Sequence, residues 1–352
     1  MSAFKRLINS SKLRISMALL MTLATGVKLE STIREMRLNK KHNITIMQID
    51  DPVNIMILNV GGAKFDDKYY QTSSQLYVDW DNLAPRHPTV ISRNVNHMIA
   101  QIKSEDPDIV MMQEVPRTFP KTTTVNVFRR FEDNINYRLS YVGNVDVLRL
   151  VEKGNVTAYR NSSNHFNKRS PYRLEGFLNN TFTSNRSTLV SRFSLDDTDA
   201  NLVTYNTHLP SFAKNIDAKY TQWSAILRHA EREFKRGNYV VIGGDFNTVL
   251  DAIGKTGVNH FVRHLDEDVR HMFNQPVPWK VAVPDQATAR SLFYPAYSED
   301  NNWTTIDGFI VSPNVEILST RTLTNEYGQP DFRASDHAPV VLEVQLGKSR
   351  AR

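Results

Sequence analysis

The chain has 352 residues, of which 40% are apolar and 23% are charged, a composition that is typical of a folded protein and excludes a wholly disordered one. It contains no cysteine, which excludes disulfide bonds, thiolate zinc sites and cysteine nucleophiles. Its formal net charge of +6 favours anionic partners such as nucleic acid, nucleotides or acidic lipid surfaces, although a basic protein can also lack such a partner.

Residues 1–50 are expected to form a targeting segment and linker. Before the first acidic residue, Glu30, four basic side chains precede an apolar run at residues 15–26. A basic region, a short apolar region and small residues at its end are typical of a secretory signal peptide, and the run is too short for a stable membrane span. Export to the periplasm or the exterior is therefore favoured, with an organellar presequence or a cytoplasmic amphipathic helix as alternatives.

Regular structure is predicted to begin at residue 53. Residues 53–60 form a short apolar run closed by two glycines, which indicates a buried strand. Residues 63–88 are polar and aromatic and are expected to form a long loop. Apolar residues at helical spacing predict a helix over residues 89–104, and residues 108–114 read as a second buried strand.

The rest of the chain alternates short β-like runs with polar turns. Helices are predicted at residues 216–236 and 258–265, the second inside an irregular insert at residues 250–300. Strands are predicted at residues 137–143, 155–160, 187–193, 201–208, 239–245, 304–311, 315–322 and 338–346. Since no linker or repeat divides the chain after residue 50, residues 51–348 are expected to be one α/β domain of two packed sheets with helices outside.

Polar side chains recur where the predicted strands end. They are Asn59, Glu114, Asn206 with His208, Asp245 with Asn247, Asp307, and Asp336 with His337. Such a set suits the hydrolysis of a phosphate ester. Carboxylate oxygens, as in Glu114 and Asp336, can hold a hard divalent cation that polarises the phosphoryl group.

Phosphate ester hydrolysis also needs a base for water and donors for the phosphoryl oxygens. His337 can act as the base if a buried carboxylate fixes its tautomer, and Asp307 is the available partner. Asn247 and His208 can donate hydrogen bonds to the phosphate. These residue types at strand ends predict a metal-dependent phosphodiesterase.

Taken in order, six short motifs resemble the endonuclease/exonuclease/phosphatase superfamily, which has a deoxyribonuclease I-like fold. They are Leu58-Asn59, Gln113-Glu114, Asn206-Thr207-His208-Leu209, Gly244-Asp245-Phe246-Asn247, Ile306-Asp307 and Ser335-Asp336-His337. Each motif alone is weak, but all six in this order and at plausible spacing are specific. The resemblance covers about residues 53–346.

The resemblance implies a four-layer α/β sandwich, with two mainly antiparallel sheets packed together and helices on the outside. It places the active site at one edge of the two sheets. It also implies a divalent metal, Mg²⁺ or Mn²⁺, held by Asn59 and Glu114 with Glu114 as the main ligand. Asp336 would be a second carboxylate beside the metal.

The same resemblance implies the catalytic roles. Asp245 and Asn247 would orient the attacking water and the scissile phosphate, and Asp307 would pair with His337. His208 would contact the phosphate or assist the leaving group. Whether His337 or Asp245 removes the proton from water stays open.

Three further residues are expected to contact the substrate. Asn206 precedes the histidine of its motif, and Tyr159 and Arg160 follow Gly154 on a predicted strand from which they could reach the phosphate. An ordinary surface arginine is the alternative for Arg160.

The substrate is less well defined by the sequence. Asn206-Thr207-His208-Leu209-Pro210 departs from the pattern of apurinic-site endonucleases, and the longer signatures of inositol-phosphate phosphatases are absent. Basic residues that would suit a phosphate backbone lie at Arg129-Arg130, at Lys168-Arg169 with Arg173, and at residues 228–236. A monomeric nuclease acting on DNA or RNA is therefore favoured.

Two other classes of function stay open. A phospholipid or sphingomyelin phosphodiesterase would use residues 293–297 as an aromatic hairpin for membrane entry, unless these residues are a packed loop. A phosphomonoesterase of the same fold is a further alternative within this class. The second class is a catalytically idle binding module that keeps the fold.

Overall fold

The two sheets are seen in a computed structural model, which describes residues 51–69, 87–118, 125–147, 151–160, 187–195, 198–210, 216–250 and 267–347. These residues all belong to one unit, Ile44–Arg352. The targeting segment predicted at residues 1–50, the helix predicted at 258–265 and the basic residues Lys168, Arg169 and Arg173 lie outside the described residues. Among the described helices, none combines the length and apolar character that a membrane crossing requires.

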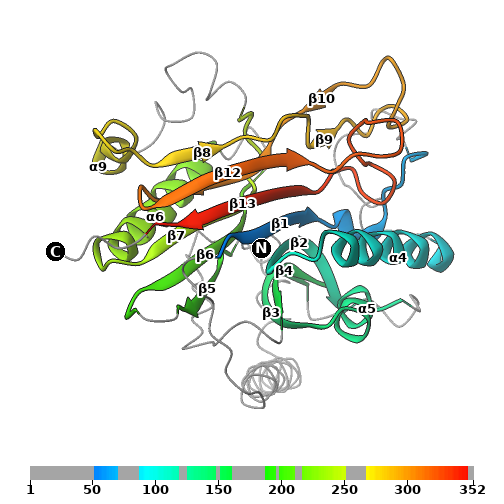
Figure 1. The fold of residues 1–352 in the computed structure, drawn as a ribbon. Helices are drawn as coiled ribbons and strands as arrows, with labels where there is room; N and C mark the ends of the chain where they lie inside the picture. Colours follow the sequence, from blue (N-terminus) through cyan, green and yellow to red (C-terminus); the bar gives the residue numbers. More distant parts are fainter. Residues whose placement is uncertain are drawn as a thin grey trace, which may run out of the picture. The chain divides into compact units, whose positions relative to one another are not determined.

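The first sheet has six strands in the order β12-β13-β1-β2-β4-β3 (Figure 1). Their bounds are β12 Val315–Thr322, β13 Val340–Leu346, β1 Val53–Asn59, β2 Ile109–Thr118, β4 Val151–Arg160 and β3 Tyr137–Val147. Only β1 and β2 are parallel neighbours in this sheet. Helix α4, Pro88–Glu105, lies between them in the chain and makes the crossover that a parallel pair requires.

The second sheet repeats this plan with five strands in the order β5-β6-β7-β11-β8. The strands are β5 Leu189–Ser194, β6 Asn201–His208, β7 Tyr239–Asp245, β11 Asp307–Val311 and β8 Lys280–Ala282. Here β6 and β7 are the parallel pair, and the crossover helix is α6, Ile216–Lys235. A short ribbon of β9, Ala289–Arg290, and β10, Trp303–Thr304, extends beyond the second sheet.

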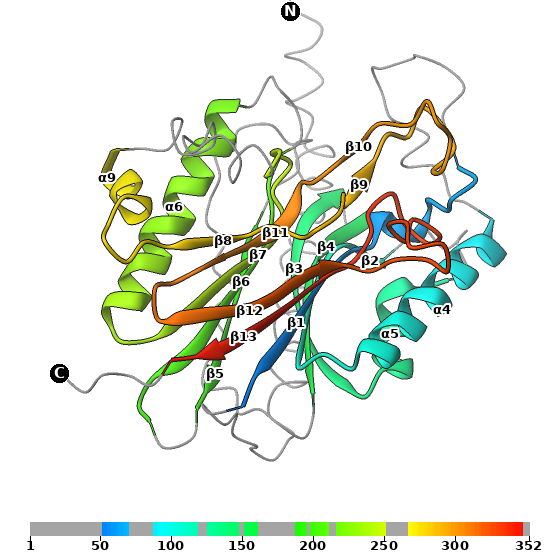
Figure 2. The same ribbon diagram turned by 45° about the horizontal axis from the view of Figure 1, so that its top comes forward.

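Three apolar layers hold these elements together. The two sheets face each other across a core that includes Ile57, Met111 and Phe309. Helix α4 and α5, Val127–Asn134, cover the outer face of the first sheet, whereas α6 and the short α9, Glu267–Arg270, cover the second (Figure 2). The predicted four-layer α/β sandwich is confirmed, and each of its sheets is mixed because it contains one parallel pair.

Most predicted elements have the expected type, and the differences have local causes. The strand predicted at residues 304–311 is interrupted, because Thr305 and Ile306 direct their carbonyl groups to the backbone N–H of Leu250 and Phe246. The strand predicted at 108–114 continues to Thr118 through an irregularity in its pairing with β4. Helix α5, which spans only eight residues, was not predicted.

Candidate active site

The carboxyl ends of the two parallel strand pairs bring the predicted side chains together. In the first sheet Asn59 lies opposite Gln113, the neighbour of Glu114. In the second sheet His208 lies opposite Asp245, and antiparallel β11 places Asp307 opposite Asp245 from the other side. Because parallel strands end at the same sheet edge, each crossover unit delivers its polar residues to one place.

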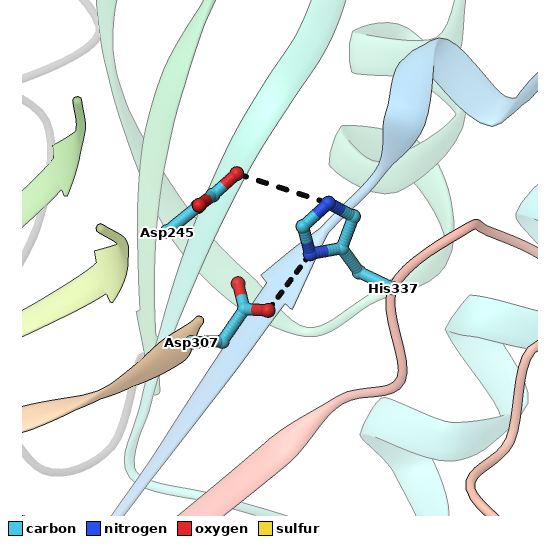
Figure 3. A group of neighbouring side chains, drawn as sticks. All are labelled: Asp245, Asp307 and His337. Carbon is cyan, nitrogen blue, oxygen red and sulfur yellow. Dashed lines mark hydrogen bonds and ion pairs between the residues drawn. The ribbon is translucent and has the colours of Figure 1, made fainter. Parts of the chain in front are cut away.

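A histidine held between two carboxylates lies at the centre of this edge. The Nδ1 atom of His337 is 2.7 Å from Oδ2 of Asp307, and its Nε2 atom is 3.7 Å from Oδ2 of Asp245 (Figure 3). Asp307 and Asp245 are almost completely buried. The hydrogen bond to Asp307 places a proton on Nδ1 and orients the ring so that Nε2 faces the second carboxylate.

Burial and charge shift the pKa values of this group in a connected way. Burial alone would lower the pKa of His337, but the charges of Asp307 and Asp245, with the hydrogen bond to Asp307, outweigh it and raise this pKa well above its ordinary value. Burial raises the pKa of Asp245 to about 7, against the lowering effect of the His337 charge. The protonation of His337 and that of Asp245 are therefore linked through their opposite charges.

His208 and Asn59 connect the two sheets at the same carboxylate. Nε2 of His208 lies 3.3 Å from Oδ2 of Asp245 and 3.6 Å from Oε1 of Glu114. Nδ2 of Asn59 donates a 3.0 Å hydrogen bond to Oδ2 of Asp245. Asn59 and Glu114 belong to the first sheet, whereas His208 and Asp245 belong to the second, so the site is formed where the sheets meet.

Glu114 has an unusual backbone conformation. Its φ angle is +58°, in the left-handed region that few residues other than glycine adopt, and it lies at the irregularity in the β2–β4 pairing. Lys153 of β4 donates a hydrogen bond to Oε2 of its carboxylate. Lys153 could not be predicted from the sequence, because only the pairing of two strands places it beside Glu114.

Asp336 fits into a space that depends on a glycine. A Cβ atom on Gly61 would lie 2.7 Å from Oδ1 of Asp336, and the φ angle of Gly61 is +54°. Ser335 joins this loop to β1, since its Oγ donates a 2.7 Å hydrogen bond to the carbonyl of Asn59. Burial raises the pKa of Asp336, and the negative charge of Glu114 raises it further, against the opposing charges of His337 and Arg290. Arg290 was also missed by sequence reasoning.

Asn247 completes the site from the turn after β7. Its φ angle is +47°, and its backbone N–H donates a 2.8 Å hydrogen bond to Oδ1 of Asp245. Its side-chain Nδ2 donates to the carbonyl of Leu209 at 2.9 Å. Asn247 as a whole is half-buried.

A comparison with protein families matches residues 92–337 to the model described as the Endonuclease/Exonuclease/phosphatase family. This chain belongs to that family. The match includes every predicted site residue except Asn59, which precedes it. A comparison with curated proteins gave no match.

Solved structures share the fold at low sequence identity. An endonuclease/exonuclease/phosphatase from Beutenbergia cavernae DSM 12333 matches with a TM-score of 0.57 and 18% identity, over 85% of this chain and 72% of that one. ANGEL2, described as a 2′,3′-cyclic phosphatase in complex with adenosine-2′,3′-vanadate, matches with 0.57 and 17%, over 86% and 98%. D. rerio TDP2, complexed with a single-strand DNA product, matches with 0.51 and 14%, over 84% and 99%.

The family motifs thus converge, whereas the three residues predicted to bind substrate lie elsewhere. Asn206 is fully buried, where it accepts a hydrogen bond from Gln113 and donates to the carbonyls of Met112 and Val156. Its side chain ties the two sheets together behind the site.

Tyr159 and Arg160 belong to β4 and lie beside the start of β2, whereas the site lies at the carboxyl end of β2. Antiparallel pairing sets Tyr159 opposite Ile109, whereas Gly154 is opposite Val115, next to Glu114. Tyr159 packs edge-on against Phe193, and Arg160 pairs with Asp106 and Asp108. The geometry gives no support to the predicted contact of Tyr159 and Arg160 with the phosphate. That prediction needed the direction and register of β4, which the sequence does not provide.

One group of side chains in this family site could hold a divalent metal, and the sequence predicts a second one. Potential ligand atoms of Asp245, Asp307 and His337 lie within 4.8 Å of one another. However, a metal there would compete with the proton that joins Asp307 to His337. The carboxylates of Glu114 and Asp336 offer the hard oxygen donors that Mg²⁺ or Mn²⁺ prefers, and their mutual repulsion is what a cation would relieve.

Proposed function

We propose that the protein is a divalent-metal-dependent phosphodiesterase that cuts nucleic acid. The observation that carries this proposal is the convergence of the His337–Asp307 pair, Asp245 and Glu114 at one sheet edge, with His208 between the last two. This group combines proton transfer with concentrated negative charge, which are the two requirements of metal-assisted phosphate ester hydrolysis.

Glu114 and Asp336, with the amide oxygen of Asn59, would hold Mg²⁺ or Mn²⁺. A bound cation polarises the phosphoryl group and neutralises charge that develops on its oxygens. Lys153 and Arg290 moderate the negative charge of these carboxylates, through the hydrogen bond to Glu114 and the electrostatic effect on Asp336. Gly61 keeps the space that lets Asp336 approach β1.

The protonation pattern favours Asp245 as the base. The raised pKa of His337 favours its imidazolium form, whereas burial raises the pKa of Asp245 to about 7. In the proposed step, Asp245 accepts a proton from water as the water oxygen attacks phosphorus and the bond to the leaving oxygen breaks. His337 stabilises the negative phosphoryl oxygens, and His208 supplies a proton to the leaving oxygen.

Nucleic acid is the proposed substrate class because of the net charge of +6 and because TDP2, of the same fold, was captured with a single-strand DNA product. The basic residues at 228–236, on α6 and just after it, add little to the case for nucleic acid. Arg228, Lys235 and Arg236 pair with Asp268, Glu231 and Glu233, so their charges are largely compensated. The binding surface is therefore expected nearer the site.

The test is cleavage of end-labelled single-stranded RNA, single-stranded DNA and plasmid DNA with Mg²⁺ or Mn²⁺, and with EDTA. We expect metal-dependent cleavage that H337A and E114Q reduce by about 10²-fold or more. H271A is the matched control, since His271 pairs with Glu231 at the surface of α6. Cleavage that persists in EDTA, or equal activity of all variants, would rule the proposal out.

A phospholipid phosphodiesterase is the second candidate, because Phe293 and Tyr294 are 49% and 41% exposed. Tyr297 of the same segment packs against Trp303 and Phe332, so this loop is only partly available for membrane entry. Sphingomyelin vesicles therefore form a further arm of the experiment. Release of phosphocholine with intact nucleic acid would favour this second candidate over the first.

A further inference from the structure

The turn that carries Asn247 needs support from outside the family motifs. Asn247 has a φ angle of +47°, a conformation that asparagine tolerates better than most residues but that still costs free energy. Its N–H binds Asp245 and its side chain binds the carbonyl of Leu209. These two contacts use the N–H and the side chain of Asn247. Neither of them holds its backbone carbonyl group in place.

Lys219 binds that carbonyl. Its Nζ atom donates a 2.6 Å hydrogen bond to the backbone oxygen of Asn247. Lys219 lies near the start of α6, the crossover helix between the strand that carries His208 and the strand that carries Asp245. A charged donor makes a shorter and stronger bond than a neutral one, so this contact can hold a strained turn.

The surroundings of Lys219 differ from those of an ordinary helix lysine. Only 8% of Lys219 is exposed, and burial lowers its pKa while the charge of Asp245 opposes this shift. In contrast, the side chain of Lys235 on the same helix is 65% exposed and pairs with Glu231 one turn away. Desolvating an ammonium group is unfavourable unless its bonds compensate, so the position of Lys219 calls for a specific role.

We propose that Lys219 is a positioning residue that fixes the Asp245–Asn247 turn in its reactive shape. It acts through Asn247, to which the family resemblance assigns the scissile phosphate, and the inference rests on the proposed function. Loss of the bond lets the turn relax towards an ordinary backbone conformation. Asn247 and the carboxylate of Asp245 then lose their alignment, whereas the groups that bind the remainder of the substrate stay in place.

Steady-state kinetics on the best nucleic acid substrate test this role with K219M, K219R and K235M. We expect K219M to lower kcat by about 10- to 100-fold with little change in KM, because small misplacements of reacting groups have effects of this size. K219R should recover most of the loss, since a guanidinium can also donate to the carbonyl. K235M, the same change on the same helix, should behave as wild type.

Hydrogen–deuterium exchange makes the test independent of activity. In K219M the peptide covering residues 246–250 should exchange faster than in wild type and K235M, because its amides bond to Asp245, Ile306 and Thr305. Unchanged exchange in this peptide, or failure of K219R to improve on K219M, would overturn the proposal. If K219M does not fold, K219Q replaces it, and global unfolding of both would also contradict a positioning role.

The two proposals fail in different ways. A wild-type protein that cleaves no nucleic acid, with faster exchange in K219M, would overturn the proposed substrate but leave the role of Lys219 in the turn intact. Cleavage by wild type with unchanged kcat in K219M would overturn only the role of Lys219.

Discussion

At the scale of single residues, the chemistry depends on the bond between Asp307 and His337. Asp307 fixes the imidazole by accepting from Nδ1 at 2.7 Å, and its charge contributes to the raised pKa of His337. Without that charge, burial would favour the neutral ring, and Nε2 would lose both its proton and its fixed direction. Asp307 is therefore a partner of the imidazole rather than a separate catalytic group.

D307N should lower kcat by about 10²-fold or more and shift its pH dependence. Removing the negative charge lowers the pKa of His337, so the imidazolium is lost at a lower pH and the alkaline limb of the profile moves towards acid. Profiles of kcat against pH for D307N and wild type measure this shift. D268N, at the exposed partner of Arg228, is the control. A shift of the acidic limb towards acid, with the alkaline limb unmoved, would show instead that His337 works as the neutral base.

Gly61 provides a second prediction at this scale. Its φ angle is +54° and an added Cβ would lie 2.7 Å from Oδ1 of Asp336, whereas Gly328 has a φ angle of +74° with nothing within 4 Å. G61A and G328A should both lose about 1 kcal/mol or more of folding free energy from backbone strain. Only G61A should also lose activity and affinity for Mn²⁺, measured by calorimetric titration. Equal activity of the two variants would remove the steric role of Gly61.

At the scale of elements, the loop between β12 and β13 has to hold Ser335, Asp336 and His337 in place. Asp331 anchors this loop, since its Oδ2 atom accepts 2.9 Å hydrogen bonds from His97 and Gln101 of α4. Arg333 binds the same carboxylate through two nitrogens at 2.8 Å. The anchor connects the catalytic loop to the helix that covers the first sheet.

Asp331 makes the stability of this loop dependent on pH. Burial alone would raise the pKa of Asp331, but hydrogen bonds from Arg333 and His97 outweigh it and hold the pKa well below its usual range. A carboxyl group with a lowered folded-state pKa stabilises the protein above its unfolded-state pKa, and this stabilisation is lost as the pH falls through the folded-state value. D331N should therefore cost roughly 2 kcal/mol at neutral pH.

Urea unfolding at several pH values tests this anchor. The difference between wild type and D331N should be largest above about pH 5 and should shrink in acid, as wild-type Asp331 becomes protonated. A difference that grows in acid would contradict the assigned role.

The sequence predicts these elements and motifs better than it predicts their contacts. The ranges of β6 and β7 follow from apolar runs, and the six motifs identify most of the side chains that converge. Lys153 and Lys219 could not be predicted, because the pairing of β4 with β2 and the packing of α6 bring them to the site. The register of β4 against β2 is likewise the reason that Arg160 lies away from the site.

At the scale of the whole molecule, the site is a joint between two similar halves. Each sheet contributes one parallel pair with its crossover helix, and Asn59 bonds to Asp245 across the two sheets. Asn206 reinforces this joint by bonding to β2 and β4 from β6. Stability and catalysis are thus linked, because the packing of the sheets sets the distances between the catalytic groups.

N206A tests whether Asn206 belongs to the joint or to the substrate site. The change leaves fully buried partners without hydrogen bonds, so unfolding free energy should fall by roughly 3 kcal/mol. Urea unfolding measures this loss, with N201A at the half-buried start of β6 as the control. An unchanged stability with a raised KM would return Asn206 to the substrate-binding role expected from the sequence.

The central claim is that this joint hydrolyses phosphodiesters with a divalent metal. Turnover of bis-p-nitrophenyl phosphate tests it most directly, because this small diester needs the chemical groups but no extended binding surface. With Mg²⁺ or Mn²⁺ the wild type should release p-nitrophenol, and H337A and E114A should lower the rate by about 10²-fold or more. A wild type that is as inactive as the two variants would contradict the account and favour a binding module that keeps the fold.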